Sequence, residues 1–192
     1  MNENIAELVL KVQNKDKSAF EEIFEIYKTS ALRTAYLLTN NKTLAEDITQ
    51  EAFVQCYLKI NELKNPSQFR VWFFKILTRI AWRMNKKENF SIPVENIFDS
   101  LNCSDGENLE DSFIEKELSK EMMSIINKLD EKHRTTILLY YYKDFSVSEI
   151  ANIMGCFEGT VKSRLYTARK HLKKSFESSY KYAKEVIEHE II

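Results

Sequence analysis

Residues 155–170 read GCFEGTVKSRLYTARK, and this stretch decides the fold of the C-terminal part of the chain. The chain has only three glycines in 192 residues, and Gly155 stands directly before its most basic segment. Ser146 and Glu149 have the spacing of a capping box, which predicts a short helix, VSEIANIM, that ends at the glycine. A second helix is expected from about Glu158, and two helices joined by such a tight turn form a helix-turn-helix unit.

The geometry of this unit makes three demands on the sequence, and each is met at a fixed offset. Ala151 is small at the point where the two helices cross. Gly155, four residues later, can adopt the positive φ that is needed just past the first helix. Val161, ten residues after the alanine, is apolar where the second helix must pack on the first. Together these matches predict a helix-turn-helix.

The open faces of the second helix carry side chains that suit duplex DNA. Residues 162–174 contain six Lys and Arg and no Asp or Glu, which is an electrostatic footprint for a polyanion. Lys and Arg donate to guanine or phosphate, Ser bonds either, and Tyr can lie against a thymine methyl. The alternative is an ordinary solvated charged surface. The preceding turn favours contact with the major groove. The candidate DNA-contacting residues on these faces are Lys162, Ser163, Tyr166, Arg169, Lys170 and Lys173.

The composition is typical of an all-α cytoplasmic protein. Hydrophobic residues make up 44% of the chain, and only three Gly and two Pro are present, which suits long helices rather than turn-rich β structure. No run of eighteen apolar residues occurs, and the first residues carry acids where a signal peptide needs cations. We therefore expect a cytoplasmic protein with no membrane insertion of its own.

The cysteines and histidines give no sign of a metal site or of catalysis. Cys56, Cys103 and Cys156 are far apart and lack CxxC spacing, so three reduced thiols are expected. The three histidines are scattered, and neither a Gly-rich phosphate loop nor a nucleophile paired with a base is evident. We predict no metal, no cofactor and no enzymatic activity.

The N-terminal part reads as an amphipathic helical bundle. Three helices are expected in it, over about residues 19–38, 43–60 and 66–87. The second begins where Thr43 and Glu46 have capping-box spacing, and the third begins where Asn65 precedes Pro66.

A segment of different composition and charge separates the two parts. The net charge of −1 hides two basic islands, residues 71–87 and 162–174, on either side of residues 88–121, which hold ten acids and two cations. Within that acidic stretch, residues 89–111 lack sustained periodicity and read as a solvated, flexible linker. The chain is thus predicted to be all-α, with two helical domains joined by a linker. The predicted parts are an N-terminal helical bundle at 1–88, the linker at 89–111, a C-terminal helix-turn-helix domain at 112–178 and a tail at 179–192.

Two further elements admit two interpretations each. The segment WFFKILTRIAWRMNKK at residues 72–87 has five cations and no acid beside a polar loop. It is either a core helix with an exposed cationic strip or a surface for single-stranded nucleic acid. On the preceding helix, Asp47, Gln50 and Glu51 lie on adjacent turns. They form either a solvated acidic face or a docking face for the arginines of a protein partner.

Taken in order, these elements resemble the extracytoplasmic-function group of bacterial sigma factors, in the sigma-70 family. AEDITQEAFVQCY resembles the core-polymerase segment of that family, and WFFKILTRIAWRMNKK resembles its minus-10 helix. The second domain carries LDEKHRTTILLYYYKDFSVSEIANIMGCFEGTVKSRLYTARKHL, which resembles the minus-35 domain throughout. The likeness covers about two-thirds of the chain, residues 19–87 and 121–176. The chain departs from the family's usual WLxRIARNxxxD pattern at Thr78, Arg79 and Arg83, which bears on the minus-10 contacts more than on the fold.

The resemblance implies roles for particular residues. It implies that the clamp coiled coil of the RNA polymerase core docks on Asp47, Ile48, Gln50, Glu51 and Phe53. It implies minus-10 contacts by Lys64, Asn65, Ser67, Gln68 and Phe69 in a base-capturing loop, and by Trp72, Arg79 and Arg83 on the helix that follows. It implies that Lys162, Ser163 and Tyr166 read minus-35 bases, with Arg164 and Arg169 on phosphates.

The resemblance also implies a function and partners. The chain would be an alternative sigma factor that directs RNA polymerase to specific promoters, binds the core enzyme at its clamp and flap, and is controlled by an anti-sigma factor. A stand-alone helix-turn-helix regulator is the alternative, and it explains only residues 130–175. Such a regulator would bind duplex DNA tightly without polymerase, whereas a sigma factor should bind promoters mainly as part of the holoenzyme.

Overall fold

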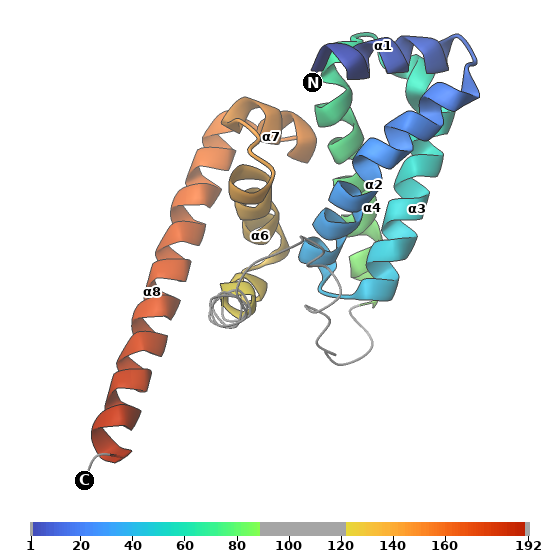
Figure 1. The fold of residues 1–192 in the computed structure, drawn as a ribbon. Coiled ribbons are helices and arrows are strands. Elements are labelled where there is room, and N and C mark those ends of the chain that lie inside the picture. The colour runs from blue at the N-terminus through green and yellow to red at the C-terminus, as the bar shows by residue number, and fades with distance from the viewer. Residues whose placement is uncertain (1, 89–121, 191–192) are drawn as a thin grey trace.

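The computed structural model describes residues 2–88 and 122–190, with side chains described over residues 4–86 and 122–177. Every regular element in these ranges is a helix, and the helices form two groups along the chain (Figure 1). The predicted all-α class with two helical domains is therefore confirmed. The predicted linker at residues 89–111 lies outside the described residues.

The first group is the predicted N-terminal bundle. Its elements are α1 (Asn2–Gln13), α2 (Lys17–Thr39), α3 (Lys42–Lys59), η1 (Ile60–Glu62), η2 (Pro66–Gln68) and α4 (Phe69–Glu88). The three predicted helices correspond to α2, α3 and α4, which lie side by side, whereas α1 crosses one end of the bundle (Figure 1). Sequence reasoning did not define α1.

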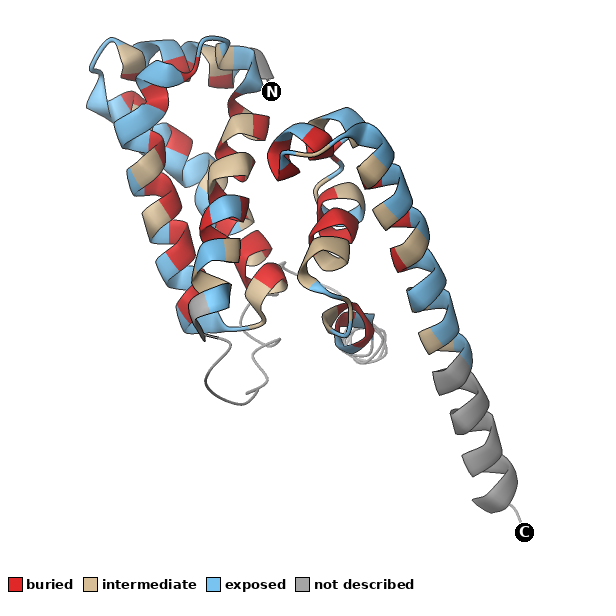
Figure 2. Cartoon of the chain, turned by 180° about the vertical axis from the view of Figure 1, so that it is seen from behind, coloured by how far each residue is buried: buried red, intermediate tan, exposed pale blue. Residues whose placement is uncertain are grey.

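The core of this bundle is rich in aromatic side chains, because α4 turns Phe69, Phe73 and Phe74 inward. The rings of Phe69 and Phe73 are stacked with centroids 5.9 Å apart, and Phe53 of α3 lies 4.9 Å from Phe73. Tyr27 of α2 meets the edge of Phe69 at 5.3 Å. Each buried phenyl side chain stabilises the fold by about 1.5–3 kcal/mol. The buried residues accordingly lie where the helices face one another (Figure 2).

Local capping sets where the N-terminal helices begin, and one prediction about it is wrong. The N-cap of α3 is Asn41, whose side chain accepts a hydrogen bond from the Leu44 N–H at 3.1 Å. The capping box predicted from Thr43 and Glu46 is not formed, because asparagine is a better N-cap than threonine and Asn41 lies nearer the preceding turn. Asn65 does cap η2, as predicted, and η2 runs directly into α4.

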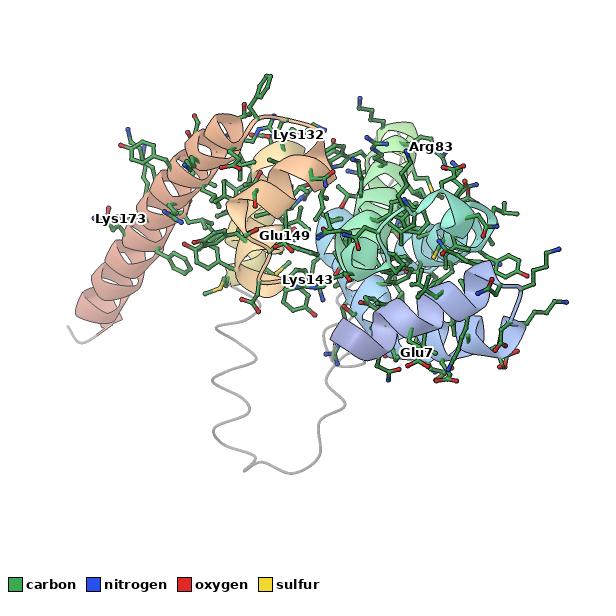
Figure 3. The ribbon with its side chains drawn as sticks, turned by 90° about the horizontal axis from the view of Figure 1, so that it is seen from above. Glu7, Arg83, Lys132, Lys143, Glu149 and Lys173 are labelled. Carbon is green, nitrogen blue, oxygen red and sulfur yellow. The ribbon has the colours of Figure 1, made fainter. Side chains whose placement is uncertain are left out.

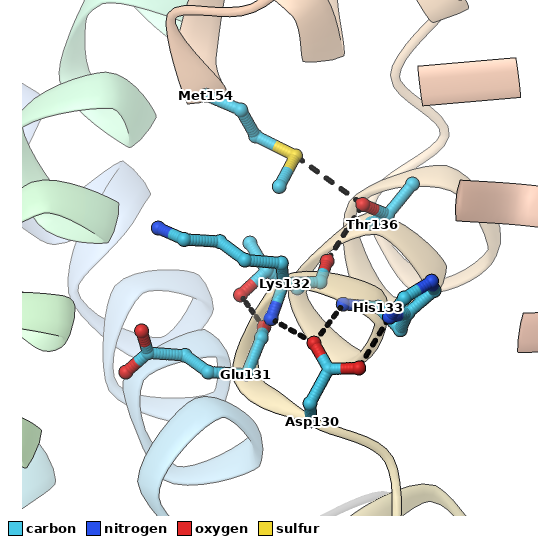
Figure 4. Close-up of polar contacts among 7 residues, drawn as sticks. Asp130, Glu131, Lys132, His133, Thr136 and Met154 are labelled. Atoms are coloured by element: carbon cyan, nitrogen blue, oxygen red, sulfur yellow. Dashed lines mark hydrogen bonds and ion pairs between the residues drawn. The ribbon is translucent and has the colours of Figure 1, made fainter. Parts of the chain in front are cut away.

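The second group is the C-terminal domain. Its elements after a helical segment at 122–127 are α6 (Glu131–Ile137), the π-helix η3 (Leu138–Tyr142), α7 (Val147–Met154) and α8 (Glu158–Glu190). Asp130 is the N-cap of α6: one of its oxygens accepts from the backbone N–H groups of Lys132 and His133, and the other contacts the His133 ring (Figure 4). The His133 ring is thus part of the start of α6.

The two domains pack against each other through α2 and α4 on one side and α6, η3 and α7 on the other. Phe74 and Phe145 meet edge to face with centroids 5.5 Å apart. The Trp82 indole N–H donates to Thr135 Oγ1 at 3.0 Å, and the Arg70 guanidinium donates to the Lys143 carbonyl. The buried apolar residues of both domains therefore form one connected cluster.

Candidate nucleic-acid interfaces

The turn between α7 and α8 has the geometry that the sequence predicts. Ser146 and Glu149 form a complete capping box at the start of α7. Gly155 ends that helix with φ 65° and ψ 44°, the left-handed conformation that glycine adopts without steric cost. Ala151 is buried, and Val161 is fully buried where α8 crosses α7. The helix-turn-helix unit is therefore present.

Four of the predicted minus-35 residues form a continuous strip on one side of α8. Lys162, Tyr166, Arg169 and Lys173 follow the spacing i, i+4, i+7 and i+11, which keeps them on the same face of a helix. All four are exposed, and 71% of the Tyr166 surface is accessible. We call this set the α8 strip. It lies about a quarter-turn around the helix from the buried face of α8, which carries Val161, Leu165 and Ala168.

The remaining predicted residues of α8 lie beside this strip or away from it. Ser163 and Lys170 are exposed on the neighbouring face. Arg164 is half-buried and points to the turn, with Nη1 3.7 Å from the Cys156 sulfur. Arg164 is therefore separated from the other six residues of the predicted set.

Sequence reasoning missed a contact that Arg169 makes with a different helix. Its Nε–H donates to the hydroxyl of Tyr141 at 2.8 Å. Its guanidinium carbon lies 5.7 Å from the ring centroids of both Tyr140 and Tyr141. The run of three tyrosines at residues 140–142 was the available signal, but periodicity alone does not say which helix they face.

The second candidate surface combines the loop around η2 with the open side of α4. Lys64, Asn65, Ser67 and Gln68 are exposed on the loop, and the Asn65 side chain accepts from the Ser67 N–H at 3.1 Å. On α4, Arg79 and Arg83 are exposed and Trp72 is half-buried. Figure 3 shows that Arg83 lies in the N-terminal domain, well apart from Lys173 on α8. The chain thus carries two separate basic surfaces.

Three residues predicted to touch a partner instead lie in the core. Phe69 and Ile48 have no accessible surface, and Phe53 has 5%. Phe69 packs on Phe73 beneath the loop, and Ile48 and Phe53 line the inner side of α3. Phe69 and Ile48 fill the space between the helices and offer no side-chain surface for direct contact with DNA or polymerase, whereas Phe53 keeps a small accessible edge in a groove between α2 and α3.

The acidic face of α3 adjoins the basic side of α4. Asp47 and Gln50 are exposed, whereas Glu51 is half-buried, accepts from the Gln55 amide at 3.1 Å and lies 3.7 Å from Arg83. A groove of about 650 Å³ between the two helices is lined by Leu44, Asp47, Gln50, Glu51, Val54, Arg83 and Met84. The predicted docking face and one predicted minus-10 residue therefore share a groove.

A larger and more apolar groove of about 970 Å³ lies between α2 and α3. Phe20, Phe24, Phe53, Val54 and Tyr57 contribute to its lining. Sequence reasoning missed this groove. A second apolar stripe on α3, at Val54, Tyr57 and Leu58, was the signal, since all three remain exposed outside the buried face.

Nothing in the described residues suggests bound metal or a membrane span. No group of three or more His, Cys, Asp or Glu is close enough to hold an ion within residues 2–88 and 122–190. Over the same ranges, no helix is long and apolar enough to cross a membrane. Cys56 and Cys156 are free thiols, and burial raises the pKa of Cys56 to about 12. Cys103 lies outside the described residues.

Comparison with known families gives two matches along the chain. The family described as Sigma-70 region 2 matches residues 23–89, and Sigma-70, region 4 matches residues 119–172. The ECF RNA polymerase sigma factor SigW of Bacillus subtilis is 32% identical over 179 residues, which cover 88% of this chain and 95% of SigW. The ECF RNA polymerase sigma-E factor of Haemophilus influenzae is 31% identical, over 86% of this chain and 92% of that protein.

Solved structures show the same fold. CnrH, in complex with the cytosolic domain of CnrY, superposes with a TM-score of 0.69 at 19% identity, over 91% of this chain and 98% of CnrH. The sigma factor RpoE of Bartonella quintana, in complex with the anti-sigma factor NepR, has a TM-score of 0.65 at 21% identity. That match covers 82% of this chain and 96% of RpoE.

Proposed function

The chain belongs to the extracytoplasmic-function (ECF) sigma factors of the sigma-70 family, and we propose from this how its surfaces take part in transcription initiation. It is an alternative sigma factor, which directs RNA polymerase to specific promoters. Its partners are the polymerase core, promoter DNA and an anti-sigma factor. It acts by binding, and the chemistry of RNA synthesis belongs to the polymerase.

The α8 strip supports the assignment of the C-terminal domain, residues 112–178, to the minus-35 element. A helix that follows a helix-turn-helix turn enters the major groove with its open face toward the bases. Lys162 and Tyr166 lie on the early turns of α8 and would read bases, with Ser163 beside them. Arg169, Lys170 and Lys173 lie further along and would hold phosphates, with Arg164 at the turn. The observation that best supports this assignment is the single exposed α8 strip directly after the turn.

The loop and the open side of α4 support the assignment of the N-terminal domain, residues 1–88, to the minus-10 element. Exposed polar side chains on the loop suit a base that has left the duplex, and Arg79 and Arg83 suit the phosphates of a single strand. The loop contacts fall to Lys64, Asn65, Ser67 and Gln68. Phe69 supports this loop from inside, and Trp72 offers a half-buried ring at its end.

The groove between α3 and α4 supports docking of the polymerase clamp on Asp47, Gln50 and Glu51. Exposed carboxylates give orientation and on-rate when they meet arginines of a partner. Asp47→Arg reverses one such charge at an exposed position, so it should block assembly with core polymerase without unfolding the chain. Co-purification with core enzyme measures this, and wild-type recovery of the variant would count against the docking face.

A mobility-shift experiment tests the function as a whole. The full chain is mixed with promoter fragments, with and without core polymerase, at several salt concentrations. A specific shift that needs core polymerase is expected, and it should weaken steeply with salt because Lys and Arg displace counterions from DNA. An equally strong specific shift by the chain alone would favour a stand-alone regulator instead.

A further inference from the structure

Arg169 is held by a side chain from another helix, and a role in phosphate binding alone does not account for this. Its Nε–H donates to the Tyr141 hydroxyl at 2.8 Å. The two rings of Tyr140 and Tyr141 flank its guanidinium at the same distance, 5.7 Å from each centroid. An exposed arginine on a helix surface would otherwise sample many rotamers.

The π-helix η3 is what presents Tyr141 to α8. The Lys143 N–H donates to the Leu138 carbonyl at 3.1 Å, which closes a turn one residue wider than that of an α-helix. Leu138 and Leu139 remain buried at the start of this turn, whereas 57% of the Tyr141 surface is exposed. The Tyr140 ring meets the Tyr141 ring edge to face at 4.9 Å and so braces it. Tyr141 is therefore a supported side chain, although it lies at the surface.

The geometry leaves the useful end of Arg169 open. Arginine has five N–H donors, and only the Nε–H is engaged with the described residues. The terminal Nη groups belong to the same strip as Lys162 and Tyr166, and such a planar fork suits two oxygens of one phosphate. A fork that is oriented before DNA arrives loses less rotamer entropy on binding.

We propose that Tyr141 is a positioning residue for minus-35 binding, which orients the Arg169 guanidinium toward a backbone phosphate of the duplex. This inference rests on the proposed function of the α8 strip. Tyr141 acts through Arg169, so its contribution depends on the presence of that arginine.

The test uses full-length chain assembled with core polymerase, and a promoter fragment that the wild-type holoenzyme recovers from sheared genomic DNA. Tyr141→Phe removes the hydroxyl and keeps the ring, so binding should weaken about 3- to 10-fold, the effect of one hydrogen bond. Tyr142→Phe is the matched control, since Tyr142 is also exposed and its hydroxyl makes no hydrogen bond to the described residues. It should change binding less than about twofold. Arg169→Ala should weaken binding and lower the salt slope by about one.

A double-mutant cycle then separates positioning from other roles. In the Arg169→Ala background, Tyr141→Phe should cause no further loss, whereas a direct DNA contact by Tyr141 would cost the same in both backgrounds and overturn the inference. Wild-type binding by Tyr141→Phe would overturn it as well. If Arg169→Ala binds normally while Lys162→Ala is weakened, the inference fails and the proposed function stands. If the wild-type holoenzyme recovers no fragment, both fail. Circular dichroism establishes that each variant is folded at the assay temperature.

Discussion

The two proposed nucleic-acid surfaces of this sigma factor are built in different ways. The α8 strip comes from one helix, whose position is set by the Ser146 capping box and the left-handed Gly155 a few residues before it. The proposed minus-10 surface takes its loop side chains from the segment around η2, its arginines from α4 and a carboxylate neighbour, Glu51, from α3. A surface made by one helix can be predicted from local signals. A surface made by three segments depends on how those segments pack.

The largest expected effect is the loss of stability caused by Phe69→Ala. Phe69 is fully buried beneath the minus-10 loop, so its truncation should lower the free energy of unfolding of the N-terminal domain by about 3–5 kcal/mol. Both tryptophans of the chain, Trp72 and Trp82, are on α4, so their fluorescence during urea unfolding reports on this helix and, through the contact of Trp82 with Thr135, on its packing against the C-terminal domain. The neighbouring exposed Gln68→Ala should change the free energy by less than about 0.5 kcal/mol. A stable Phe69→Ala chain that fails to open promoters would return Phe69 to the DNA surface.

A substitution in the α8 strip should weaken promoter binding and leave stability unchanged, the reverse of the effect expected at Phe69. Tyr166 is 71% exposed, so Tyr166→Ala should leave the free energy of unfolding unchanged yet weaken promoter binding by about 1–3 kcal/mol. Tyr166→Phe keeps the ring and should retain most of the affinity if the ring meets a thymine methyl. Holoenzyme titrations of a promoter fragment measure both variants. Equal binding by wild type and Tyr166→Ala would remove Tyr166 from the recognition surface.

The two glycines near the start of α8 test whether backbone conformation fixes the turn. A Cβ at Gly155 meets nothing within 4 Å, so the cost of Gly155→Ala comes from its φ of 65° alone and should be about 1–2 kcal/mol. Gly159 is helical with equally open surroundings, so Gly159→Ala should instead stabilise the domain by about 0.5–1 kcal/mol. Thermal unfolding followed by circular dichroism compares the two. Shifts of the same sign would contradict this account of the turn.

The smallest expected effect concerns the start of α3. Asn41→Ala removes the observed N-cap and should cost about 1 kcal/mol, whereas Thr43→Ala, at the position of the expected cap, should cost less than about 0.5 kcal/mol. Urea unfolding measures the difference between these variants. A larger loss for Thr43→Ala would show that the hydrogen bond from Leu44 to Asn41 contributes little.

Local sequence signals predicted much of the fold, and the remainder depended on how the helices pack. Ser146 and Gly155 could be assigned from sequence, because each makes its hydrogen bonds within a few residues of itself. Periodicity also identified α2, α3 and α4 of the N-terminal bundle but not α1. It could not say which residues at the edge of an apolar face turn inward, and so Phe69 and Ile48 were assigned to partners although both are buried.

The contact between Arg169 and Tyr141 shows the same limit. Tyr141 is 28 residues away along the chain, and its place depends on the π-turn of η3. A turn of this kind is set by the balance of packing around a helix and has no sequence signature comparable to a capping residue. The α2–α3 groove escaped prediction for a related reason, since an exposed apolar stripe looks like a buried one until the partner helix is in place.

The contact between Phe74 and Phe145 has a consequence for the energetics of assembly. Any bound state in which the domains move apart must wet part of both rings and release Arg70 from the Phe145 face, where it now lies 4.0 Å from the centroid. The loss of these two contacts alone costs on the order of 1–3 kcal/mol. Partners that hold the domains apart would therefore bind more tightly once a mutation weakens the contact between Phe74 and Phe145, even though the mutation lies outside the surface that they bind.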